Sequence, residues 1–144
     1  MAASQRETIL KALKTCLEGI TLANGYAIEV KEVRRGIHFE DDMPNRPALG
    51  FTNTKSERGE GQGWSKRILT ILIYGYVDIQ PGDNDNLDDL LQAVEQRLQT
   101  TAAWAYQGWT NIKDYTTYEG GAHDRLGYFD MEITITYFHD WASP

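Results

Sequence analysis

Residues 65–79 carry the most regular alternation of apolar and polar positions in the chain. From Leu69 to Ile79 the odd positions are aliphatic except at Gly75, whereas the even positions are more polar and aromatic and include Tyr74 and Tyr76. Side chains alternate across a β-strand, so this pattern predicts a long strand with one aliphatic face and one mixed face. Gly75 lies where a bulge or bend is expected. The aliphatic face requires helices to cover it, and the mixed face requires water or another protein.

Two other segments have apolar residues at the three- and four-residue spacing that is typical of amphipathic helices. The first begins at a capping box formed by Ser4 and Glu7 and is expected to end near Gly25. The second begins after the turn-rich residues 80–86 and is expected to end within residues 102–108. Both helices have a single apolar side, so each is predicted to pack on the sheet.

Four further strands are predicted at residues 26–33, 47–52, 109–118 and 128–138. Residues 55–63 are Gly-rich and charged with no apolar anchor, so we expect a loop that is mobile until a partner binds it. The order is helix, three strands, helix, two strands. It predicts one α+β domain over residues 1–144, a two-layer sandwich in which two helices cover one face of a mainly antiparallel sheet of four to five strands.

Charge is unevenly distributed along the 144 residues. The net charge of −7 argues against a general nucleic-acid binder, and from residue 78 onward there are twelve acidic and three basic residues. The first half is close to balanced and contains the basic pairs Arg34–Arg35 and Lys66–Arg67. This polarity fits either subunits that pack through opposite charges or a solvated acidic surface. The single cysteine allows no internal disulfide, and no run resembles a membrane span or a signal peptide, so we expect a soluble, unexported protein.

The sequence contains no recognisable constellation for catalysis. Its three histidines lie in separate segments, and motifs for a Ser or Cys nucleophile, a dinucleotide or a kinase are absent from it. We therefore expect no enzymatic activity and no metal or organic cofactor. The aromatic residues either complete the core or contact another protein, since aromatic side chains are enriched at interfaces. The candidate interface residues are Arg34, Arg35, Lys55, Glu57, Arg58, Trp64, Tyr74 and Tyr76.

Several runs of the sequence, in their order, form a familiar pattern. These are R-E-T-I-L-K-A-L-K-T-C-L, N-G-Y before I-E-V-K-E-V-R-R-G, P-A-L-G-F before a Gly-rich segment, I-L-T-I-L-I-Y-G-Y-V, and L-D-D-L-L-Q-A-V-E-Q-R-L. In this pattern the chain resembles, over nearly its whole length, the tail terminator (tail-completion) proteins of tailed bacteriophages of the lambda type. None of these runs is a catalytic signature, so no individual residue role is carried over.

The resemblance implies a structural protein that forms a homo-oligomeric ring, usually a hexamer. Such a ring caps the tail tube, ends its polymerisation and offers its other side to the head–tail connector or stopper protein. DNA only passes through the channel. The protein would be found in the neck of the virion, and in the host cytoplasm during assembly. Two alternatives stay open: a head-closure or other tail protein, and a small cytoplasmic α+β enzyme or ligand-binding domain.

Overall fold

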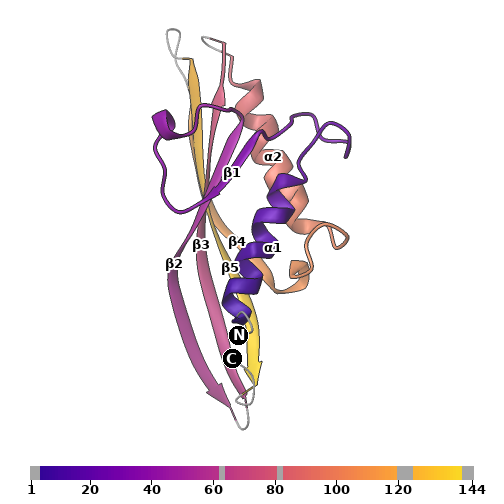
Figure 1. Cartoon of the computed structure of the whole chain (residues 1–144), viewed down its shortest axis with the longest axis vertical. Helices are drawn as coiled ribbons and strands as arrows, with labels where there is room; N and C mark the ends of the chain where they lie inside the picture. Colours follow the sequence, from indigo (N-terminus) through magenta and orange to yellow (C-terminus); the bar gives the residue numbers. More distant parts are fainter. Residues whose placement is uncertain (1–3, 62–63, 81–82, 120–124, 141–144) are drawn as a thin grey trace.

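The computed structural model of the chain describes residues 4–61, 64–80, 83–119 and 125–140. A five-stranded sheet in the order β1-β2-β3-β5-β4 forms one layer, and two helices cover one of its faces (Figure 1). β1 pairs with β2 in parallel, and the other neighbouring strands are antiparallel. The predicted α+β sandwich is therefore confirmed. The elements in chain order are α1 (Gln5–Glu18), β1 (Glu32–Arg35), η1 (Glu40–Asp42), β2 (Ala48–Gly61), β3 (Trp64–Asp78), α2 (Asp85–Gln99), η2 (Gln107–Trp109), β4 (Thr110–Tyr118) and β5 (Leu126–Asp140).

The aliphatic face of β3 forms the centre of the core. Leu69, Ile71 and Ile73 are buried on this face, where they pair with apolar residues of β5. Both helices lie over them and contribute apolar side chains, among them Ile9, Leu13, Leu17, Leu90, Val94 and Leu98. Fully burying one such side chain contributes about 1.5–3 kcal/mol to folding. The prediction that helices cover the aliphatic face is confirmed.

Gly75 does not form the bulge that the sequence indicated. It pairs in regular register with Leu49 on one side and Phe129 on the other. A Cβ atom at this position would lie 2.4 Å from the Phe129 ring and 2.9 Å from the Leu49 side chain. Glycine is therefore needed here because neighbouring side chains fill its face of the strand. The register shifts occur instead at 53/55 in β2 and at 112/114 in β4.

The first helix ends earlier than its pattern predicts, at Glu18 rather than near Gly25. In a continuing helix the Cys16 carbonyl would accept from the amide of residue 20. It accepts instead from the Gly19 amide at 3.2 Å and from Nε of Arg97 on α2 at 2.7 Å. A cation at this end also complements the helix dipole. The second helix likewise ends before the expected range, at Gln99, while the N-cap role of Ser4 is confirmed by its 3.1 Å bond from the Glu7 amide.

The prediction of a strand over residues 26–33 is largely wrong. Only Glu32 and the residues after it pair with β2, although Ile28 and Val30 are buried as expected. β2, the partner of β1, determines where the pairing begins. Pro47 immediately precedes β2 and has no amide proton with which to extend the ladder. The predicted strands at residues 109–118 and 128–138 are confirmed as β4 and β5, each with small changes at its ends.

The prediction of a mobile loop at residues 55–63 is also wrong for the residues that the structure describes. Residues 55–61 continue β2 and pair with residues 64–70 of β3. Backbone ladder bonds need no apolar side chain, so the polar composition did not prevent a strand here. We call these two paired segments, residues 55–61 and 64–70, the β2–β3 arm. Residues 62 and 63 of the predicted loop lie outside the described residues.

The face of the sheet opposite the helices is only partly covered. The segment between β1 and β2 crosses one end of it, on the side away from the helices (Figure 1). There Met43, Ala48, Tyr74 and Tyr76 form a second, smaller buried cluster, against which Tyr128 packs. We call this side of the sheet, with the even-numbered residues of β3, the open face.

Candidate interaction surface

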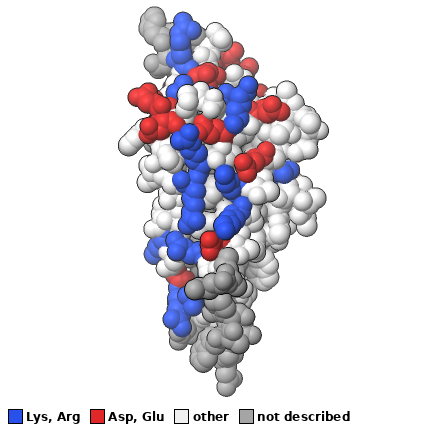
Figure 2. Space-filling view, in the orientation of Figure 1, with Lys and Arg blue, Asp and Glu red and all other residues white. Residues whose placement is uncertain are grey.

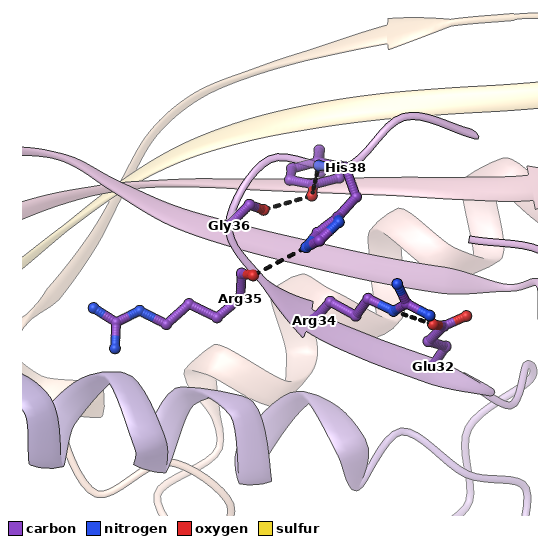
Figure 3. A network of polar contacts seen from close by, with 6 residues as sticks. Glu32, Arg34, Arg35, Gly36 and His38 are labelled. Atoms are coloured by element: carbon purple, nitrogen blue, oxygen red, sulfur yellow. Dashed lines mark hydrogen bonds and ion pairs between the residues drawn. The ribbon is translucent and has the colours of Figure 1, made fainter. Parts of the chain in front are cut away.

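Arg34 and Arg35, the first candidate interface residues, lie on β1 at one edge of the sheet, and both are exposed. The Arg34 guanidinium forms an ion pair with Glu32 two residues before it (Figure 3). Arg35 uses its backbone carbonyl to contact the His38 ring at 3.1 Å, and its side chain points away from that contact (Figure 3). Both guanidinium groups therefore face the solvent at the sheet edge, as an interface role requires.

Tyr74 and Tyr76 cannot act as the sequence suggested, because the chain itself buries them. Their exposed fractions are 3% and 8%. The Tyr74 hydroxyl accepts from the His38 amide at 2.7 Å and donates to the Gly36 carbonyl at 2.6 Å, and the Tyr76 hydroxyl donates to the His38 carbonyl at 3.0 Å. Burial raises the pKa of both phenols, so the hydroxyls keep the protons that they donate. Their role is to fix the loop that follows β1.

The fixed loop presents two large apolar side chains to solvent. Ile37 is 69% exposed and Phe39 is 72% exposed, although the backbone between them is held by the two tyrosines. Further along the loop, Arg46 donates to the Glu40 carbonyl at 2.9 Å and pairs with Asp78 at 3.1 Å. Neither exposed side chain stood out in the sequence, because their exposure follows from tertiary hydrogen bonds.

The remaining candidates lie on the β2–β3 arm. Lys55, Glu57 and Arg58 are exposed on β2, and Lys55 pairs with Glu57 at 3.2 Å. Trp64 begins β3, but its side chain lies outside the described residues. β1 covers β2 only over residues 48–51, so no strand of the described ranges pairs with the outer side of the arm. The structure thus brings together Arg34 and Arg35 on β1, and it places the arm residues further along the same edge.

An acidic groove of about 250 Å³ crosses the open face toward the opposite edge. Asp114 on β4 and Glu132 on β5 are direct cross-strand partners in it, and Asp130 lies two residues along β5. Among the described residues, no Lys, Arg or His side chain forms an ion pair with these three carboxylates. Like charges directly opposite each other destabilise a strand pair, so this groove favours a positively charged partner.

Sequence reasoning did not select the groove residues. The alternation of Asp130 and Glu132 on the polar face of the last strand was visible, and it indicated a face open to water or to a partner. What the sequence lacked was the register that places Asp114 opposite Glu132. Tyr115 and Tyr118 on β4 are also about half exposed, at 51% and 54%.

The uneven charge of the sequence becomes a spatial difference between the two edges of the sheet. α1, β1 and β2 together contain seven basic and five acidic residues, whereas α2, β4 and β5 contain two basic and eight acidic residues. We call these sides the basic edge and the acidic edge. Figure 2 shows the side on which β1 and α1 lie in front, where Lys and Arg form a column down the middle and Asp and Glu gather toward its upper end.

No group of three His, Cys, Asp or Glu side chains among the described residues is arranged to hold a metal ion. Nor does any helix within the described ranges have the length and apolar character needed to cross a membrane. Comparisons with protein-family models and with curated proteins find no match for this chain.

Proposed function

We propose that this protein is a tail terminator of a tailed bacteriophage. In this role it forms a homo-oligomeric ring, of the hexameric kind that the sequence resemblance implies, on the end of the tail tube. The ring ends tube polymerisation and offers its other side to the head–tail connector or stopper protein. The chain acts as a structural component without enzymatic activity, in the virion neck, and DNA passes through the channel.

The observation that carries this proposal is the opposite charge of the two sheet edges. A contact between different surfaces of identical subunits produces a ring when its rotation closes. Such a contact needs two surfaces that complement each other and do not complement themselves. The basic edge with Arg34 and Arg35 and the acidic edge with Asp114 and Glu132 meet this requirement. Complementary charge also orients the encounter of subunits and speeds their association.

The experiment that tests the function is removal of the protein from phage assembly. Without a terminator, tube subunits continue to add, so electron micrographs should contain overlong tails that are not joined to heads. Supplying the protein from a plasmid should restore tails of uniform length. Tails of normal length joined to heads in its absence would show that it is not the terminator.

A further inference from the structure

We propose that Arg34 and Arg35 of one subunit dock against the acidic groove and Tyr115 of the next copy in the ring. This inference rests on the proposed ring and specifies which residues form its side-to-side contact. The occupant of the groove is thus a second copy of this chain.

The two surfaces lie at the same level of the sheet, on opposite edges. Following the register from edge to edge, one row is Arg34, Gly50, Tyr74, Asp130 and Thr116. The next row is Arg35, Phe51, Ile73, Met131 and Tyr115. Each arginine therefore shares a row with a residue of the opposite surface. A neighbour related by rotation about an axis along the strands meets these residues without any shift along that axis.

The absence of a shift matters for closure. A head-to-tail contact that includes a translation along its axis builds an open helix, whereas one without translation closes into a ring. Asp114 and Glu132 lie one strand repeat of roughly 6.6–6.8 Å further along, which an extended arginine side chain spans. The position of Arg34 and Arg35 along the strand direction therefore lets them reach the groove of the next subunit without the translation that would prevent a closed ring.

The residues that would meet also lie on the same face of the sheet, as well as at the same level along the strands. Residues in one row share a face, so Arg34 lies on the open face with Asp130. Arg35 lies in the row of Tyr115, which starts on the helix-covered face and also lines the acidic groove. Rotation about an axis along the strands keeps each face on its own side of the ring. Arg34 then meets carboxylates that have no cation among the described side chains, and Arg35 meets the ring of a half-exposed tyrosine.

The side chains on both sides have matching chemistry. Guanidinium groups bind carboxylates with paired, charge-assisted hydrogen bonds and also stack favourably on aromatic rings. A cation between Asp114 and Glu132 removes the repulsion of this cross-strand pair. Arg34 and Arg35 lie at the end of β1, and the Tyr74 hydrogen bonds hold the loop that follows them. Less backbone entropy is therefore lost when they dock.

Two variants, each defective on one side of the contact, test the proposal. Arg34→Glu/Arg35→Glu removes the docking arginines, and Asp114→Lys/Glu132→Lys removes the groove charge. Each alone should weaken self-association on the order of a hundredfold. In an equimolar mixture the intact groove of the first meets the intact arginines of the second, and the lysines in the groove of the second face the glutamates at the edge of the first. Sedimentation should therefore detect mixed assemblies that neither variant forms alone.

A matched control is Lys66→Glu/Arg67→Glu, which reverses an adjacent basic pair on the central strand, away from both edges. It should assemble as the wild type does, and circular dichroism should confirm that all three variants fold. A wild type that forms rings together with an arginine variant that forms them equally well would overturn this contact and leave the proposed function standing. Folded variants that do not pair when mixed would also overturn it. A wild type that stays monomeric would remove both proposals.

Discussion

At the level of Ile71 the two faces of the sheet have different surroundings. Ile71 pairs with Ile133, and both are fully buried beneath the helices. The next residue of β5, Thr134, faces the other side and is only half-buried beside the acidic groove. One face therefore supplies the burial that holds the chain folded. The other face keeps polar and charged groups at positions that another molecule can reach.

The largest effect is expected from a charge on the helix-covered face. Ile71→Asp places a carboxylate where no cation lies opposite it, since its neighbours in the core are apolar. An unpaired buried charge costs several kcal/mol, which is comparable to the ~5–15 kcal/mol that hold a typical domain folded. The variant should be insoluble or unfolded by circular dichroism.

Thr134→Asp is the matched change on the open face. The new carboxylate there is reached by water, so the variant should fold with its sedimentation and circular dichroism close to those of the wild type. If both aspartate variants fold equally well, the assignment of the two faces is wrong.

A smaller loss is expected from Gly75→Ala, which overpacks the helix-covered face. The added methyl group would overlap the Phe129 ring and the Leu49 side chain. Overpacking of this kind costs about 1–3 kcal/mol, measured as the free energy of unfolding in urea. Gly108→Ala serves as the control, because a Cβ at Gly108 has no atom within 4 Å. Equal stability of the two variants would contradict the close packing at Gly75.

On the open face, Tyr74→Phe should cost about 1–2 kcal/mol. It removes the hydroxyl that bonds to both the His38 amide and the Gly36 carbonyl. Hydrogen exchange at the His38 amide should also accelerate, because the loop loses its anchor. Tyr118→Phe, at a tyrosine that is 54% exposed, should leave stability unchanged. Unaltered exchange at His38 would show that the hydroxyl does not fix the loop.

The smallest effect concerns the alkaline range and Cys16, on the buried side of α1. Burial raises the pKa of the Cys16 thiol to about 11 from its usual 9.0, although the nearby Arg97 opposes this shift. Because the folded pKa is the higher one, the stabilising contribution is complete below pH 9 and is lost as pH rises toward 11. Stability should fall by about 1 kcal/mol between pH 8 and pH 10 on this account.

Cys16→Ala isolates that contribution. The buried tyrosines also lower the free energy of unfolding at alkaline pH, and they do so equally in both proteins. Only the difference between the two slopes of stability against pH therefore reports the ionisation of the thiol. Parallel slopes for wild type and Cys16→Ala in urea unfolding would show that the thiol does not titrate differently on folding.

Elements that depend on local patterning were predictable from the sequence. The two-faced β3, the cap at Ser4 and both final strands follow from alternation and capping chemistry within a few residues. Elements whose limits depend on a distant partner were not. The end of α1 follows from Arg97, 81 residues away, and the β2–β3 arm extends because a partner strand is long enough to pair with it.

The candidate surface was predictable in part for the same reason. Exposed arginines at a strand end were visible as a basic pair, and they lie at the sheet edge as an interface requires. Tyr74 and Tyr76 looked like surplus aromatics, but a loop that starts 38 residues earlier buries them. The groove needs the β4–β5 register, which no local pattern specifies.

In the proposed ring the basic and acidic edges of neighbouring subunits meet head to tail. Sedimentation of the wild-type protein over a wide concentration range, together with negative-stain images of the same samples, tests it most directly. We expect one closed species larger than a dimer, with a mass that stops growing as concentration rises and a ring-shaped image. A monomer at every concentration, a dimer that is symmetric and final, or a ladder of ever longer assemblies would contradict it.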